Sequence, residues 1–582
     1  MKSFFKNILS TIIGIGISII VIILLFVGLI TVISSEKTTP IKENSILKID
    51  LANTSVVERT SENPFDAINL SGEVAKTIEL KEVLDNIEKA KTDDNIKCIY
   101  INTSFVNAGL AQIEEIRNKL LEFKNTSKPI IAYSEVYSQS AYYLASVANK
   151  IYLNPEGIIE LKGLSISQLF FKGLLEKLDV DMQIIRHGKF KSAVEPFTLE
   201  KMSPSNREQM TLFLNSIADN IMDSISSQRG FTLSKIQKHA NNLSLENAKS
   251  CLELDYVDAL LYQDQIEDSL RVVSGGEKLN FISLKKYTAV KLQKEEISRN
   301  KIAIIYATGT IYSGKGDEKN IGSETTAKAI KKAREDKNVK AIVFRINSGG
   351  GSSLASDVIW RETVLAKAEK PLVISMGDYA ASGGYYIACA ADSIVANPTT
   401  LTGSIGVFGM VPNLQKFYKN KLGITMDTVN TSKYADIGMK RPLTNFEKNK
   451  IQKNVEHVYN TFITRVSEGR NMSKAAVDEI GQGRVWTGYD AKSIGLIDSY
   501  GGIEKAIEIG ALLAEIEDYR IISLPKKKDP FTELAQQLGS ETNITDVVIT
   551  KLGFRTKLIE PIENFLNEDR IQARIPFIME LK

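Results

Sequence analysis

The chain repeats part of its own sequence, and this repeat limits the folds that it can adopt. Residues 131–155, IAYSEVYSQSAYYLASVANKIYLNP, align with residues 374–398, ISMGDYAASGGYYIACAADSIVANP, and share a Tyr pair, an Ala-rich stretch and a closing Asn-Pro. Upstream, IKCIYINTS at 96–104 aligns with VKAIVFRINS at 339–348, and an amphipathic helical pattern follows each. Each half therefore predicts alternating strands and helices, and the period is too long for a solenoid of short repeats.

Alternation of this kind is typical of right-handed βαβ units with a mainly parallel sheet. We therefore expect an α/β protein with two tandem domains that arose by internal duplication. A length of 582 residues is enough for two large domains. The expected boundaries are 45–300 for the first domain, 301–525 for the second and 526–582 for a C-terminal extension that begins near the charged stretch KKKDP.

The N-terminal region carries a long apolar run. Residues 7–35 contain no charged side chain, Lys2 and Lys6 precede them, and Glu36 and Lys37 follow. About 20 apolar residues cross a bilayer, whereas the apolar core of a cleaved signal peptide is usually about 7 to 15 residues long. We expect a retained transmembrane anchor with its N-terminus in the cytoplasm and the rest of the chain across the membrane, the alternative being a cleaved signal sequence.

The composition excludes several classes of function. The 73 basic and 70 acidic residues nearly cancel, to a formal net charge of +3, so a nucleic-acid partner is not expected. Three cysteines and three histidines are scattered without metal-binding spacing, and we expect neither a metal nor a cofactor. The stretch GTIYSGKG at 309–316 nearly matches a phosphate-binding loop, but Gly316 stands where a Mg²⁺-binding hydroxyl belongs.

The two copies differ at polar positions, and these differences point to chemistry. Ser382 lies between two alanines and two glycines, and the first copy has Gln139 at the aligned position. Downstream the relation is reversed, because Lys191 of the first copy aligns with Ala435 of the second. One copy thus retains a hydroxyl that could act as a nucleophile, and the other retains an amine that could act as a base.

A serine hydroxyl needs a base to become a good nucleophile, and with so few histidines a neutral lysine is the next candidate. Lys191 can serve only if burial lowers its pKa, and Phe190 and the residues SAV that follow offer an apolar setting. On local sequence alone, Lys191 could also be one surface lysine among many.

Glycines near Ser382 could supply an oxyanion hole. Gly350 and Gly351 follow the strand-like AIVFRIN, and Gly383 opens a helical stretch directly after the serine. Their backbone N–H groups could stabilise the negative charge of a tetrahedral intermediate. Taken alone, the glycine loop could also be an ordinary flexible turn.

Several motifs together resemble the signal peptide peptidase A (protease IV) family in its long, duplicated form. They are KAIVFRINSGGGS, YAASGGYYIACAAD, LTGSIGVFG, KFKSAVEPFT and GRVWTGYDAKSIGLID. The resemblance extends from the anchor to about residue 510. In one place the chain departs from the family, which usually has a proline where this sequence has Gly349.

The resemblance implies a membrane-anchored serine endopeptidase with crotonase-like and Clp-protease-like domains, which degrades cleaved signal peptides through a Ser/Lys dyad. It matches the nucleophile to Ser382, the general base to Lys191, and a serine that orients the lysine to Ser404, which could otherwise be a turn hydroxyl. It also implies a homo-oligomer, with a tetramer suspected, and a single-pass protein of the bacterial inner membrane whose catalytic domains lie on the extracytoplasmic side.

Two other functions remain open from the residues themselves. Glycine loops on βαβ repeats also suit a crotonase-type acyl-CoA enzyme, which needs no serine and lysine pair. Degenerate copies would also suit a non-catalytic membrane scaffold, although the two halves retain complementary groups.

Overall fold

The computed structural model describes residues 41–60, 76–291, 298–527 and 571–575, together with positions 14 and 17. Apart from these two positions, the anchor expected at 7–35 lies outside the described residues. Within the described part of the chain, no helix combines the length and the apolar character needed to cross a membrane.

The first half of the chain forms a six-stranded sheet in which all neighbours are parallel. Its strands are rich in buried Ile, Leu and Tyr, as expected for a parallel sheet covered on both faces. In the order of the sheet, the strands are β8 (Ala259–Leu260), β6 (Lys150–Ile159), β5 (Ile130–Tyr137), β4 (Ile96–Ile101), β1 (Ser45–Ile49) and β9 (Asn280–Ser283). Two further strands, β2 (Ser55–Val57) and β3 (Thr77–Glu79), pair with each other in parallel.

The second half forms an eight-stranded sheet in which only the pair at one edge, β17 and β19, is antiparallel. Its central path is β19 (Val485–Thr487), β17 (Leu401–Gly403), β15 (Leu372–Ala381), β13 (Val339–Ser348), β10 (Lys301–Thr308) and β21 (Arg520–Leu524). Off this path, β16 (Ser393–Ala396) pairs with β15 and with β20 (Ser499–Tyr500). The prediction of an α/β fold with a mainly parallel sheet in each half is confirmed.

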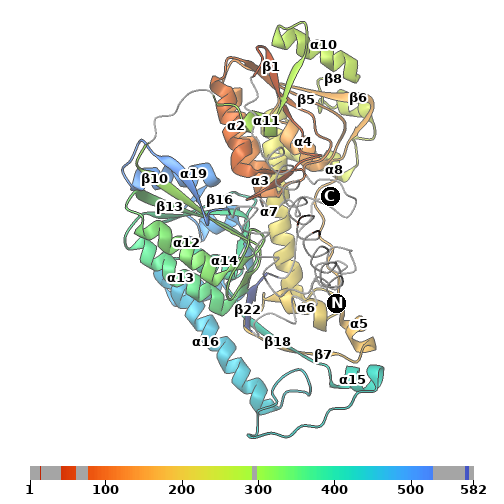
Figure 1. Ribbon diagram of the computed structural model, residues 1–582. Coiled ribbons are helices and arrows are strands. Elements are labelled where there is room, and N and C mark those ends of the chain that lie inside the picture. The colour runs from red at the N-terminus through yellow and green to blue at the C-terminus, as the bar shows by residue number, and fades with distance from the viewer. Residues whose placement is uncertain are drawn as a thin grey trace, which may run out of the picture.

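Helices connect and cover the strands of both sheets. Figure 1 shows α12 and α13 on one face of the second sheet and α19 on the other. Those of the first half are α2 (Leu80–Thr92), α3 (Leu110–Lys124), α4 (Gln139–Ala145), α5 (Lys172–Lys177), η1 (Ser192–Val194), α6 (Glu195–Thr198), α7 (Pro204–Arg229), α8 (Leu233–Asn241), α9 (Ala248–Glu253), α10 (Gln263–Ser274) and α11 (Leu284–Thr288). Those of the second half are α12 (Ser323–Glu335), α13 (Ser353–Lys367), α14 (Gly383–Ala388), α15 (Gln415–Leu422), α16 (Asn445–Arg470), α17 (Lys474–Ile480), α18 (Gly488–Ser493) and α19 (Ile503–Leu513).

A third, mixed sheet takes strands from both sides of residue 300. Its order is β12 (Ile321–Gly322), β11 (Ile311–Tyr312), β14 (Gly350–Ser352), β22 (Ile571–Arg574), β18 (Phe408–Asn413) and β7 (Asp181–Arg186). The first half contributes β7, which runs antiparallel to β18, and the C-terminal extension contributes β22. Comparing the copies in sequence does not reveal this sheet, because it pairs the halves with each other.

The halves also share buried contacts. Arg345 on β13 is fully buried and forms ion pairs of 2.8 Å with Glu58 and with Glu115, which both come from the first half. One cluster of buried apolar side chains continues from the first sheet into the second. The helix α7 packs beside the second sheet, where Ser216 hydrogen-bonds Thr487 at 2.9 Å (Figure 1).

Candidate active site

Ser382 lies at a sharp turn between the end of β15 and the start of α14. Its backbone has φ 55° and ψ −114°, a strained conformation for a residue with a side chain. The neighbours must be small here, because a Cβ on Gly384 would lie 2.6 Å from the carbonyl oxygen of Ser348. Two backbone hydrogen bonds hold the turn, from Ser382 N–H to the Gly403 carbonyl (2.8 Å) and from Tyr386 N–H to the Ser382 carbonyl (2.8 Å).

Lys191 comes from the first half and lies between β7 and η1. The pairing of β7 with β18 brings this segment to the second half, and Phe190 N–H donates to the Gln482 carbonyl at 3.1 Å. The Nζ atom of Lys191 lies 2.8 Å from the Oγ atom of Ser382. Both side chains are fully buried. The structure thus brings together the two groups that the sequence comparison divided between the halves.

Burial alone shifts the titration of this lysine. It lowers the pKa of Lys191 well below its usual value, because the charged form loses its hydration. Among the described residues, no carboxylate forms an ion pair with Nζ that would offset this effect. The amine is therefore poised to be neutral, which is the form that can accept a proton.

Ser404 lies beside the same amine, in the turn after β17. Its Oγ atom is 3.1 Å and its carbonyl oxygen 3.3 Å from Lys191 Nζ. A neutral amine has two N–H bonds and one lone pair, so donation to these two oxygens directs the lone pair toward the third neighbour, Ser382.

The three glycines expected at the oxyanion hole divide into two groups. Gly350 lies against Gly383, since a Cβ built on Gly350 would lie 2.7 Å from the Gly383 nitrogen. Gly351 instead faces β11, because its Cβ would lie 2.0 Å from the carbonyl oxygen of Ile311. In this structure the N–H of Gly350 donates to Ser348 Oγ at 3.1 Å.

Sequence reasoning missed the residues that enclose the lysine. Gly483 has φ 84° and packs on it so closely that a Cβ there would lie 2.6 Å from Lys191 Cβ. A Cβ on Gly406 would lie 3.2 Å from Lys191 Cδ. The carbonyl oxygen of Gly406 lies 3.4 Å from Ser382 Oγ. Gly406 stands in the quoted stretch LTGSIGVFG, and Gly483 is the first residue of the quoted stretch GRVWTGYDAKSIGLID. The sequence shows only that Gly406 and Gly483 are glycines, and it does not indicate that they pack against Lys191.

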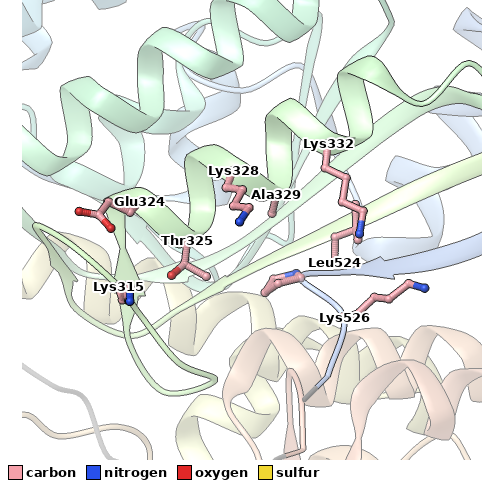
Figure 2. A pocket seen from close by; sticks show the side chains of 9 residues that line it. Lys315, Glu324, Thr325, Lys328, Ala329, Lys332, Leu524 and Lys526 are labelled. Atoms are coloured by element: carbon pink, nitrogen blue, oxygen red, sulfur yellow. The ribbon is translucent and has the colours of Figure 1, made fainter. Parts of the chain in front are cut away.

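A pocket elsewhere on the second half has different chemistry. Figure 2 shows that it lies between α12 and the end of β21. Its lining contains four lysines and one carboxylate, from Lys315, Glu324, Thr325, Lys328, Ala329, Lys332, Leu524, Pro525 and Lys526. The loop that resembled a phosphate-binding motif lies beside it, but its Gly316 N–H donates to Thr325 Oγ1 at 3.0 Å. None of the residues expected at the active site lines this pocket.

Comparisons with known proteins identify the family. The model of Peptidase family S49 matches residues 122–275 and 365–517. Protease 4 of Salmonella typhi is 38% identical over 453 residues, which is 76% of this chain and 73% of that protein. The chloroplastic serine protease SPPA of Arabidopsis thaliana is 34% identical over 514 residues, 86% of this chain and 75% of that protein. A solved mutant of the 1510-N membrane-bound stomatin-specific protease, in complex with a substrate peptide, matches with a TM-score of 0.27 and 14% identity, covering 42% of this chain and 99% of that one.

Proposed function

The chain belongs to peptidase family S49 and is a serine peptidase, and we propose that Ser382 and Lys191 form its catalytic dyad. The observation that carries this proposal is the distance of 2.8 Å between Lys191 Nζ and Ser382 Oγ in a fully buried site. A neutral lysine beside a serine hydroxyl is an established way to generate an alkoxide nucleophile without histidine. The acyl-CoA enzyme and the non-catalytic scaffold are set aside, because neither is a serine peptidase.

The first half of the reaction forms an acyl-enzyme. Lys191 accepts the proton of Ser382 while Oγ attacks the peptide carbonyl carbon. Ser404 holds the amine through its two oxygens, so that the lone pair stays directed at the hydroxyl. The N–H of Gly383 and the N–H of Gly350 stabilise the oxyanion, the latter exchanging Ser348 Oγ for the charged oxygen. Gly351 shapes the loop through its contact with β11.

The second half of the reaction releases the products. The ammonium of Lys191 protonates the leaving amine, and the C–N bond breaks. Lys191, now neutral again, deprotonates a water molecule, which attacks the ester. The acid product leaves and Ser382 regains its hydroxyl proton from Lys191. Because every step needs Lys191 to exchange a proton, its lowered pKa is part of the mechanism.

The substrates, location and assembly follow from the sequence resemblance and belong to the same proposal. The substrates are apolar peptides such as cleaved signal peptides. Residues 7–35 anchor the chain once in the bacterial inner membrane with a cytoplasmic N-terminus, and the crotonase-like domains at 45–300 and 301–525 work on the extracytoplasmic side as a homo-oligomer, with a tetramer as the first expectation. The uncharged run flanked by lysines supports this orientation.

Hydrolysis of a fluorogenic, leucine-rich peptide by the full chain in detergent tests the proposal. We expect Ser382→Ala and Lys191→Ala to abolish turnover, and the matched control Lys189→Ala, which changes an exposed lysine two positions away, to retain it. Circular dichroism establishes that each variant is folded. Equal turnover in the wild type and both dyad variants would refute the dyad.

A further inference from the structure

The segment that carries Lys191 is a connection between two elements. It joins β7 to η1, and Lys191 lies outside both, with φ −75° and ψ 79°. A residue in a connection has no ladder or helix of its own to fix its backbone, so it is positioned by whatever holds the connection. The distance of 2.8 Å from Nζ to Ser382 Oγ therefore depends on the contacts that the neighbours of Lys191 make.

One buried side chain, that of Gln209 on α7, holds this segment on both sides of the lysine. Its Nε2 atom donates to the Phe190 carbonyl and to Ser192 Oγ, each at 3.0 Å. The same nitrogen lies 3.2 Å from Asn206 Oδ1, one turn earlier on α7. Gln209 is 1% exposed, and Ser192 is fully buried. Gln209 thus bonds the residue before Lys191 and the residue after it, and fixes the point from which the lysine side chain extends.

The other end of the same amide bonds the second half of the chain. Gln209 Oε1 accepts from the Val485 N–H at 3.2 Å, at the start of β19. The two residues before Val485 bond Ser404, whose N–H donates to the Arg484 carbonyl at 2.7 Å and whose Oγ donates to the Gly483 carbonyl at 3.4 Å. Ser404 in turn contacts Lys191 Nζ through both of its oxygens. Gln209 therefore connects the segment that carries the amine to the segment that holds the hydrogen-bond partner of the amine.

A carboxamide suits this place because it carries donors and an acceptor on one small group. Its two N–H bonds face the oxygens of the lysine segment, and its carbonyl faces the N–H of β19. A hydrocarbon side chain of similar size would leave Ser192 Oγ without this donor and the Val485 N–H without this acceptor, and unpaired polar groups inside a protein are costly. A carboxylate would keep the acceptor but would set a negative charge against the Phe190 carbonyl.

We propose that Gln209 is a positioning residue for the reaction, which holds the Lys191 segment against β19 so that Nζ stays enclosed between Ser382 and Ser404. The inference rests on the proposed dyad. Without Gln209 the segment can move away from β19, and water can reach the amine. Proton transfer then slows, because a small displacement of a reacting group costs much of the rate. The pKa of Lys191 also rises toward its usual value, because the ammonium form regains hydration.

The pH dependence of kcat/KM for the fluorogenic peptide, measured on the full chain in detergent, tests the proposal. We expect Gln209→Leu to lower kcat about 10- to 100-fold at neutral pH, with KM within about two-fold of the wild type. The rise of the profile should move to higher pH by about one unit or more. The matched control is Gln112→Leu in the first half, because Gln112 is also buried (4% exposed) and its Nε2 donates to Glu58 at 3.0 Å. This control should lose stability and keep the pH profile of the wild type.

A second variant makes the test independent of how Gln209→Leu folds. Ser192→Ala removes one hydrogen-bond partner of Gln209 with little change in size, and should shift the profile in the same direction by a smaller amount. In the double variant, the loss of Ser192 Oγ should add nothing to Gln209→Leu, because the two residues act through one shared hydrogen bond. The rate at which a fluorophosphonate labels Ser382 does not depend on peptide binding, and it should fall together with kcat.

The outcomes separate this inference from the proposed dyad. An unshifted pH profile in folded Gln209→Leu, or the same shift in Gln112→Leu, would mean that Gln209 serves the fold alone and would overturn the proposal. If Gln209→Leu does not fold, the profile of Ser192→Ala decides in the same way. Turnover that survives in Ser382→Ala and Lys191→Ala overturns the dyad and this inference together, whereas inactive dyad variants beside an unaltered Gln209→Leu overturn this inference alone.

Discussion

Replacing Lys191 by methionine tests whether the buried amine is neutral in the folded protein. Methionine removes the titrating nitrogen and keeps an unbranched, flexible side chain. Burial lowers the pKa of Lys191 well below its usual value in the folded chain, while in the unfolded chain the pKa is about 10.4. Between these two pKa values, the unfolded wild type binds one more proton than the folded wild type, and the methionine variant has no such difference.

One proton corresponds to a slope of about 1.4 kcal/mol per pH unit in the free energy of unfolding. Since the unfolded state binds the extra proton, the wild type gains stability relative to the variant as pH rises through this window. Below the folded pKa and above about 10.4, the difference between the two proteins should not depend on pH.

Urea unfolding of the full chain in detergent, repeated at several pH values between neutral and alkaline, measures this slope. Tryptophan fluorescence reports on the second half, because both tryptophans, Trp360 and Trp486, lie there. The control Lys189→Met changes an exposed neighbour and should follow the wild type. The kcat/KM of the wild type should rise with pH through the same folded pKa, as the base form of the amine accumulates.

Parallel pH dependences of the wild type and Lys191→Met would refute the reasoning. They would mean that Lys191 binds the same number of protons in the folded and unfolded states. The amine would then be charged in the site at neutral pH, and a proton could not pass to it from the serine.

Three further substitutions test the surroundings of the proposed dyad. Ser404→Ala removes one hydrogen bond to Lys191, worth about 1 kcal/mol, so kcat/KM should fall about five-fold without loss of peptide binding, and Ser404→Thr should restore part of it. Gly483→Ala should lower both kcat and the thermal midpoint, because the new Cβ would lie 2.6 Å from Lys191 Cβ. The control Gly230→Ala is also at positive φ but has open space around it, and should cost only about 1 kcal/mol in unfolding free energy. Equal effects of the two substitutions would contradict the packing argument. Arg345→Met leaves two buried carboxylates without their cation and should cost about 3 to 5 kcal/mol at neutral pH. Burial raises the pKa of Glu115, so calorimetry should show a smaller loss at acidic pH, where this carboxyl can protonate, and an unchanged deficit would contradict this account.

The sequence by itself determined the architecture of each half and the division of the catalytic candidates. Strand and helix periodicity is local, so the repeat at 131–155 and 374–398 was sufficient to predict two mainly parallel sheets. The small residues around Ser382 have a local cause too, the strained turn between β15 and α14. Comparing the copies then drew attention to Lys191, because the second copy has the non-ionisable Ala435 at the aligned position.

Only the tertiary structure decided how these parts meet. Lys191 reaches Ser382 because β7 pairs with β18, and a pairing between segments more than 200 residues apart leaves no periodic signal in either segment. The same holds for the ion pairs of Arg345 and for β22, which a sequence pattern could not place beside Gly350 and Gly351. Periodicity predicts which face of a helix or strand is buried. It does not predict which other element packs against that face, because that contact forms only in the folded tertiary structure.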